Sequence, residues 1–425
     1  MSLDVNISEP DEFNCFELHE CIKSVAEIYN IHIFTYHVDL VCGKGENYVA
    51  NVFRVTINET DKDNSVSFIV KTLINTVRQE LFRELHKREV NAYKQVIEKF
   101  VLLQNILPDN ERTVVPKCIF ASTTKNNEVI ILEDLLLRGF VIQSKFSKCE
   151  NLDYSGVCFI ITELAKFHAL SFVFQYEDES NFKCMSNEFK DLIFQDKFLN
   201  KTKLRNYFHE SYLMSLNLIT DTEAKNKLEK VNDKLIEILR MYTEAKNFNV
   251  FCHGDCWINN ILFKDEGEGK QLCFLDFQAM RYASPATDII YFLYLCTDST
   301  FRTDYFEDLK IAYYKTLESF LRKFDIDVNN VYPKEEFHRD INEMLPYGLL
   351  IALVELRIVT TTHEDEMNSY DSEGNIDTYE DSKREPNRTK LYEIRVNDVV
   401  NDSVKSGVMD RLLNLVETCQ SSYLC

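Results

Sequence analysis

The sequence predicts an α+β protein with two lobes, a small N-terminal lobe rich in strands and a larger, mainly helical C-terminal lobe. Residues 33–75 read as strands, including the largely β-branched and apolar run Val49–Ile57. Over residues 78–100, and again from about residue 151, apolar side chains recur every three or four positions, as on one face of a helix. With 425 residues, the chain is long enough to build more than one lobe.

The expected elements of the N-terminal lobe alternate between helix and strand. A first helix precedes two strands joined by a polar turn, and a long helix then leads to two further strands. We place the N-terminal lobe at residues 1–136 and the C-terminal lobe at residues 137–425. In order, the predicted N-terminal elements are Phe16–Tyr29, Val49–Ile57, the turn Asp61–Asn64, Val66–Lys71, the helix over 78–100, Val114–Ala121 and Val129–Asp134.

The C-terminal lobe is predicted to consist mainly of amphipathic helices. Between residues 249 and 282 the helical pattern breaks into short strands and turns, and this island holds the most informative residues. The polar, acidic tract His363–Lys390 is expected to form a surface loop. The predicted helices are Val157–Phe174, Thr222–Ala245, Phe301–Phe324 and Asp410–Thr418.

Composition narrows the class of protein. The 48 basic and 69 acidic residues give a net charge of −21, so nucleic acid is not an expected partner. The longest apolar stretches are too short to span a bilayer, and the N-terminus lacks a secretory pattern. The thirteen cysteines have no framework spacing, and Cys252 and Cys256 lack a second ligand pair for zinc. We therefore expect a cytoplasmic protein with free thiols, monomeric and without a membrane partner.

The segment His253-Gly254-Asp255, with Asn260 and Asp276, carries the main chemical signal. Asn260 precedes one apolar strand and Asp276 follows the next, so a hairpin would bring them to the same end. Their amide and carboxylate oxygens suit Mg²⁺. Asp255, on the loop, would orient a hydroxyl and accept its proton. This arrangement predicts a phosphoryl-transfer centre with Asp255 as catalytic residue; the alternative is an ordinary polar turn.

Upstream residues indicate that the phosphoryl donor is ATP. Lys71 ends a strand, and Glu89 lies on the following helix, as expected for a lysine that reaches the phosphates and a glutamate that holds it. Glu80 and Glu84 are rival acids, but the helical phase that buries the apolar residues favours Glu89.

Two further segments are candidates for nucleotide binding. Gly43, Gly45 and Asn47 precede a strand and would cover the phosphates with backbone N–H groups, although two glycines near a strand usually mark a turn. Glu133 lies at the expected connection between the lobes, where its backbone would bond adenine.

Supporting roles are expected for the neighbours of the catalytic loop. His253 is interpreted mainly as a structural brace, and Trp257 as an anchor beside the loop. Asp288 precedes an apolar helix and is either an N-terminal cap or a brace for the loop, or both. His168 is interpreted as a packed helix histidine rather than a catalyst.

The candidate residues named above follow one another along the chain in an order that resembles the kinase-like fold of choline kinases and aminoglycoside phosphotransferases. The sequence resembles more closely the ecdysteroid kinase-like family, also called CHK kinase-like. The resemblance covers about residues 40–295. It implies a protein kinase-like bilobal fold and the phosphorylation, by ATP with Mg²⁺, of a hydroxyl on an ecdysteroid or related small molecule. The most specific matching pieces are His253-Gly-Asp-Cys-Trp257 with Asn260, Asp276-Phe-Gln278, and Asp288 with Tyr291-Phe292.

Three other functions would each require different features of the sequence. A protein kinase would need an activation segment and a peptide platform, but only twelve positions separate Asp276 from Asp288 and no Ala-Pro-Glu follows. A choline- or aminoglycoside-type kinase would need several carboxylates for its cationic acceptor. A catalytically silent binding protein on the same scaffold is the third possibility.

Overall fold

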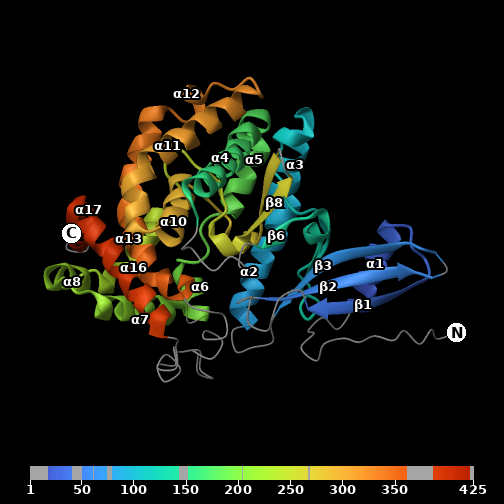
Figure 1. Cartoon of the computed structure of the whole chain (residues 1–425), viewed down its shortest axis with the longest axis horizontal. Helices are drawn as coiled ribbons and strands as arrows, with labels where there is room; N and C mark the ends of the chain where they lie inside the picture. Colours follow the sequence, from blue (N-terminus) through green and yellow to red (C-terminus); the bar gives the residue numbers. More distant parts are fainter. Residues whose placement is uncertain are drawn as a thin grey trace.

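The structure is a computed structural model of the chain, and it describes residues 18–40, 50–60, 62–73, 79–142, 152–202, 204–266, 269–360 and 386–421. Its described part has two lobes, as predicted (Figure 1). The strands β1–β3 and helix α1 lie at one end, and the green-to-red helices of the C-terminal lobe lie at the other. The α+β fold class is therefore confirmed.

An antiparallel sheet of five strands, in the order β1-β2-β3-β5-β4, forms the N-terminal lobe. Helix α1 (Leu18–Ile28) packs its apolar side chains against this sheet. In β3, Phe68 and Val70 face this core, so Lys71, the next residue, faces the other side of the sheet. The strands are β1 (Phe34–Leu40), β2 (Ala50–Glu59), β3 (Ser65–Leu73), β4 (Cys118–Ser122) and β5 (Val129–Glu133).

The long helix expected over residues 78–100 is present as three consecutive segments. They are α2 (Gln79–Asn91), a π-helical segment (Ala92–Ile97) and α3 (Glu98–Leu103). The π-helical segment begins three residues after Glu89. Segments of this kind occur mostly as single turns and often lie near functional sites. Arg88 of α2 donates to the carbonyl oxygens of Met280 (3.2 Å) and Lys190 (3.0 Å), which ties the helix to the C-terminal lobe.

Helices dominate the C-terminal lobe. The central one is α4 (Tyr154–Glu177). Contrary to the expectation that the apolar stretches are too short to span a bilayer, α4 is long and apolar enough by length and composition, but 78% of its apolar 18-residue window is buried inside the fold, as in a core helix. Helix α10 packs against α13, and α13 also packs against α7. The remaining helices are α5 (Glu179–Glu188), α6 (Asp196–Thr202), α7 (Leu204–Leu218), α8 (Thr222–Glu229), α9 (Leu235–Thr243), α10 (Ala286–Cys296), α11 (Ser299–Arg322), α12 (Val328–Val331), α13 (Lys334–Val359), α16 (Pro386–Lys405) and α17 (Val408–Ser421).

Two small sheets occupy the region between residues 249 and 282. Strands β8 (Ile261–Glu266) and β9 (Gly269–Phe274) form a hairpin, with β6 (Val141–Ile142) beside β8. Strand β7 (Val250–Cys252) pairs with β10 (Arg281–Ala283). In the hairpin register Ile261 lies opposite Phe274, so the residues just outside these two positions emerge at one end of the hairpin.

Two predicted elements were wrong in part. The single helix expected over Thr222–Ala245 is divided into α8 and α9 by a short 3₁₀ segment, Asn232–Lys234, because Asn and Asp favour turns over helix interiors. The loop expected at His363–Lys390 ends earlier, since α16 begins at Pro386, a residue type favoured in the first turn of a helix. Residues 361–385 lie outside the described residues. The lobe boundary at residue 136 stays a prediction, and it falls within the 3₁₀ segment Leu135–Arg138.

Candidate active site

Lys71, Glu89 and Asp276 come together from three distant parts of the chain. The Lys71 Nζ atom lies 2.6 Å from Glu89 Oε2 and 2.9 Å from Asp276 Oδ1. Lys71 and Glu89 are nearly buried, with side-chain exposures of 12% and 2%, whereas Asp276 keeps 25%. The ammonium group is thus held at the point where the sheet, α2 and the end of the β8–β9 hairpin meet.

Electrostatics keeps Lys71 in its charged form. Burial acts to lower the pKa of Lys71, but the carboxylates of Asp276 and Glu89 outweigh it, so the pKa is raised above its ordinary value. Burial, together with the charge of Asp276, raises the pKa of Glu89, and the Lys71 ammonium opposes this rise. The group that would face anionic phosphates is therefore a protonated lysine.

Asp276 follows strand β9 in an unusual backbone conformation. Its φ of 64° lies in the left-handed region, which residues other than glycine rarely adopt. Such strained positions concentrate at functional sites. The N–H of Leu275 donates to the carbonyl oxygen of Asn260 (2.8 Å), so Asn260 and Asp276 emerge at the same end of the hairpin, as expected from the sequence.

Asp255 is held by two side chains. The Tyr291 hydroxyl donates to Asp255 Oδ1 (2.8 Å), and Asn260 Nδ2 donates to Asp255 Oδ2 (3.1 Å) and to its carbonyl oxygen (2.9 Å). Burial and the nearby charge of Asp276 raise the pKa of Asp255, while the bonds from Tyr291 and Asn260 oppose the rise. A carboxylate with a raised pKa is a stronger base, which suits a group that accepts the proton of a hydroxyl.

Gly254 is required by the path of the loop. Its φ is 87°, in the region that favours glycine, and a side chain here would overlap the carbonyl oxygen of Ala279. The close approach brings the loop that carries Asp255 onto the short 3₁₀ segment Phe277–Ala279 that follows Asp276. The glycine thus allows the loop that carries Asp255 and the segment after Asp276 to pack directly on each other.

Asp288 holds the loop that carries Asp255 by accepting hydrogen bonds from its backbone. Its Oδ2 accepts from the N–H of His253 (2.6 Å) and from His168 Nε2 (3.1 Å), and its Oδ1 accepts from the N–H of Gly254 (3.0 Å). Burial alone would raise the pKa of Asp288, but the His168 hydrogen bond and nearby positive groups lower it below its ordinary value. The residue at the helix N-terminus is Pro285, so the bracing interpretation holds rather than the cap.

The ring of His253 links the loop to the hairpin. Nε2 donates to the carbonyl oxygen of Leu275 (2.8 Å), and Nδ1 accepts from the N–H of Asp255 (3.2 Å). Both ring nitrogens are therefore used for loop architecture, which agrees with the interpretation of His253 as a brace. His168 is fully buried between Asp288 and Tyr313, as a packed helix histidine should be.

The oxygen atoms at this end of the hairpin fit a hard divalent cation. Asn260 uses its amide nitrogen on Asp255, which leaves its amide oxygen available, and Asp276 has one carboxylate oxygen beyond the one that Lys71 contacts. An amide oxygen and a partly exposed carboxylate are ligands that Mg²⁺ prefers. Asn260 and Asp276 are thus the residues that would hold the ion.

Of the remaining candidates for nucleotide binding, the structure describes only Glu133. Gly43, Gly45 and Asn47 lie outside the described residues. Glu133 ends β5 at the connection between the lobes, but its N–H donates to the carbonyl oxygen of Lys117 (3.0 Å). That N–H is used within the sheet, and a backbone contact of Glu133 with adenine stays a prediction. Trp257 is partly buried and packs against the main apolar core, consistent with an anchor.

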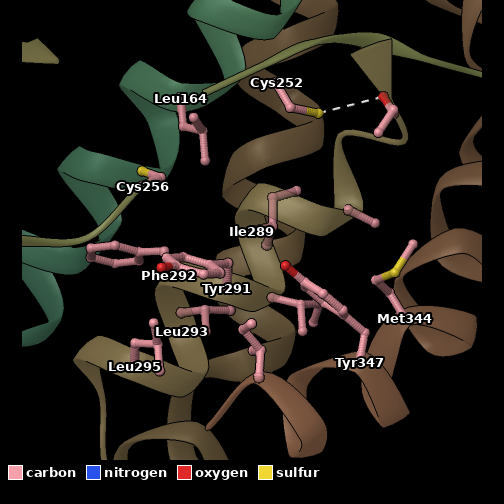
Figure 2. Packing of buried hydrophobic residues seen from close by; sticks show 14 of the residues in the cluster. Leu164, Cys252, Cys256, Ile289, Tyr291, Phe292, Leu293, Leu295, Met344 and Tyr347 are labelled. Atoms are coloured by element: carbon pink, nitrogen blue, oxygen red, sulfur yellow. Dashed lines mark hydrogen bonds between the residues drawn. The ribbon is translucent and has the colours of Figure 1, made fainter. Parts of the chain in front are cut away.

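The two cysteines beside the loop belong to the core. Figure 2 shows Cys252 and Cys256 among the buried apolar side chains. Burial raises the pKa of both thiols. Cys252, His168 and Asp288 lie close enough to hold a metal ion, but the His168 nitrogens bond to Asp288 and Tyr313, so these groups form a hydrogen-bond network.

Sequence reasoning did not assign roles to three residues of this region. Tyr291 lies three positions after Asp288 on α10, and this spacing places both on the side of the helix next to the loop. Arg88, adjacent to Glu89, could have been noticed as a second charged residue beside the site. Glu355 of α13 is separated from Asp255 by 100 positions, and no local pattern signals it.

The solved structures that resemble this chain are distant in sequence. No curated protein matches the chain. Among solved structures, APH(2")-IIia in complex with GDP and kanamycin is 12% identical, with 92% of this chain and 99% of that chain covered and a TM-score of 0.40. A microcompartment-associated aminopropanol kinase is 10% identical, with coverages of 91% and 98% and a TM-score of 0.43. An ethanolamine kinase of Plasmodium vivax is 12% identical, with coverages of 76% and 78% and a TM-score of 0.34. These similarities are too distant to carry conclusions about activity.

The family comparison is more direct. The model of the ecdysteroid kinase-like family matches residues 44–326, well over half of the chain. The matched range contains Lys71, Glu89, Asp255, Asn260 and Asp276, and the two-lobed α+β architecture is the kinase-like fold that the sequence predicts. The chain belongs to the ecdysteroid kinase-like family.

Proposed function

We propose that this protein is an ATP-dependent phosphotransferase that phosphorylates a hydroxyl group of a small molecule. The observation that carries the proposal is the convergence of Lys71, Glu89, Asp276, Asn260 and Asp255 at one point between the lobes. These five residues come from β3, α2, the catalytic loop and the end of the β8–β9 hairpin. Each has the chemistry that phosphoryl transfer needs at its position.

In the proposed reaction, Asp255 orients the acceptor hydroxyl and accepts its proton as the oxygen attacks the γ-phosphorus of ATP. The bond from that phosphorus to the bridging oxygen of ADP breaks, and ADP leaves. Lys71, fixed by Glu89, places its positive charge on the phosphates. A magnesium ion, when bound by Asn260 and Asp276, supplies further neutralisation of phosphate charge.

The acceptor is proposed to be an ecdysteroid or a related hydroxylated steroid or xenobiotic, on the strength of the family. The interval between Asp276 and Asp288 is filled by the short 3₁₀ segment, β10 and the start of α10. An extended peptide platform therefore has no place there, which favours a small acceptor over a protein.

ADP release measured with a panel of hydroxylated steroids and phenolics tests the proposal. Asp255→Asn should reduce the rate by at least about a hundredfold, because the base is lost while the fold is kept. Binding of Mg²⁺-ATP, followed by thermal shift, should be retained in this variant and reduced in Lys71→Ala. Turnover that survives Asp255→Asn would refute the role of Asp255, and a wild-type protein that binds no Mg²⁺-ATP would favour a silent binding protein.

A further inference from the structure

Arg88, the residue before Glu89 on α2, binds the backbone of the C-terminal lobe at two points. Its guanidinium group donates to the carbonyl oxygens of Met280 (3.2 Å) and Lys190 (3.0 Å). The same group lies over the ring of Phe189, 5.1 Å from the ring centroid. A planar guanidinium presents its donors in a fixed fork, so it can bond two acceptors in one defined geometry. Arg88 thus joins α2 to two backbone segments at once.

The two acceptors belong to one connected piece of backbone beside Asp276. Met280 lies four positions after Asp276, at the end of the short 3₁₀ segment. The segment that contains Lys190 is bonded to the same stretch, because the N–H of Tyr282 donates to the carbonyl oxygen of Phe189 (2.6 Å). The arginine therefore binds a unit that continues directly from one of the carboxylates of the site.

Other bonds hold α2 to the sheet. Arg83 Nε donates to Glu128 Oε1 (2.7 Å) in a buried ion pair, and His86 Nε2 donates to the carbonyl oxygen of Ser122 (2.8 Å). Glu128 directly precedes β5, and Ser122 ends β4. Because these bonds do not involve position 88, they would keep α2 with the sheet if the arginine were removed.

We propose that Arg88 is a positioning residue that keeps α2 in register with the segment after Asp276. This register lets the ammonium group of Lys71 lie 2.6 Å from Glu89 and 2.9 Å from Asp276 at the same time. Without Arg88, the remaining bonds hold Glu89 with the sheet, and the contact between Lys71 and Asp276 is lost. The inference rests on the proposed function, since it says how the charge that faces the phosphates is placed.

Calorimetric binding of Mg²⁺-ATP tests the consequence for the nucleotide site. Arg88→Met keeps the apolar stem but removes both bonds, and it should weaken binding roughly 2- to 30-fold, as for other mutations in a contact network that joins two sites. Arg88→Lys, which keeps a donor but not the fork, should weaken binding less.

Two control variants remove a positive charge elsewhere and should leave the Kd for Mg²⁺-ATP unchanged. Lys87→Met changes the adjacent position on α2, where the side chain is 44% exposed. Arg302→Met removes an arginine with similar contacts inside the C-terminal lobe, since Arg302 donates to the carbonyl oxygen of Thr297 and lies over the ring of Tyr294.

Acylation of Lys71 by a small amine reagent, quantified on peptides by mass spectrometry without nucleotide, tests the register itself. An amine held by two carboxylates reacts slowly, so Lys71 should react several-fold faster in Arg88→Met and at the wild-type rate in Arg302→Met. Asp276→Asn completes a double-mutant cycle, because asparagine is tolerated at positive φ and removes one of the two carboxylates. In that background Arg88→Met should have little further effect.

The outcomes separate this proposal from the proposed function. Unchanged reactivity of Lys71 in Arg88→Met, or an equal effect of Arg88→Met with and without Asp276→Asn, would overturn the role of Arg88. Equal weakening of Mg²⁺-ATP binding in Arg302→Met would also overturn it, since general destabilisation would then explain the loss. A wild type that binds no Mg²⁺-ATP would refute the proposed function, while the reactivity of Lys71 would still decide the role of Arg88.

Discussion

Replacing Asp288 with asparagine is expected to destabilise the loop that carries Asp255. The two carboxylate oxygens accept from two backbone N–H groups, those of His253 and Gly254, and from His168. Asparagine offers one oxygen and one amino group in the same space. Whichever way the amide is turned, its NH₂ faces at least one backbone N–H, and that donor cannot rotate away.

The expected decrease in the free energy of unfolding follows from the number of hydrogen bonds that Asp288 accepts. One buried N–H left without an acceptor costs about 1–3 kcal/mol, and each surviving bond loses the roughly 1 kcal/mol that a charged acceptor adds. The expected decrease in the free energy of unfolding is therefore about 3–5 kcal/mol, near that for breaking a buried ion pair. Denaturant unfolding at pH 7 measures it, and ADP release should fall in parallel because the loop positions the base.

Asp340→Asn is a matched control. Asp340 is also a buried carboxylate, but its partners are the hydroxyl groups of Tyr332 (2.9 Å) and Ser284 (3.3 Å). Hydroxyl groups can rotate to accept from an amide, so this variant should lose no more than about 1 kcal/mol. If Asp288→Asn is no more destabilising than Asp340→Asn, the bracing role argued for Asp288 is wrong.

Three further substitutions test other parts of the site. Gly254→Ala should cost several kcal/mol of unfolding free energy, because of a clash with a backbone carbonyl, whereas Gly407→Ala, also at positive φ but with open space around it, should cost only about 1 kcal/mol. Glu89→Gln should lower the ADP release rate by roughly 10- to 100-fold, while Glu84→Gln on the same helix should leave it near the wild-type value. For Glu355, whose pKa rises from 4.5 to about 8 on folding, the native state keeps a proton that the unfolded chain loses. The wild type should therefore lose up to a few kcal/mol relative to Glu355→Gln as pH rises through this range, and equal slopes in denaturation at several pH values would contradict it.

Local patterns were sufficient for the sheet and for the centre of the site. Alternation in β3 predicts which residues face the core, and this places Lys71 on the opposite face. The spacing around the β8–β9 hairpin predicts that Asn260 and Asp276 emerge together, because hairpin register is a short-range property. The Lys71–Glu89 contact followed from helical phase, and the structure brings these two side chains to 2.6 Å.

Features that depend on packing between distant elements could not be predicted. Glu355 meets Tyr207 because α13 packs against α7, and Tyr291 reaches Asp255 because α10 lies beside the loop. A single sequence contains no signal for which helices pack together. The engagement of the Glu133 N–H by Lys117 likewise depends on the pairing of β4 with β5, which a strand-by-strand reading leaves open.

The contacts of Arg88 join helix α2 to the C-terminal lobe. Through its bonds to Met280 and Lys190, α2 is tied to the C-terminal lobe, although it follows strand β3 in the sequence. Glu89, the next residue, is held on the side of that lobe, where Asp276 also lies. Lys71 is the group that joins the sheet to both carboxylates, so any separation of the sheet from α2 would have to break the Lys71–Glu89 ion pair.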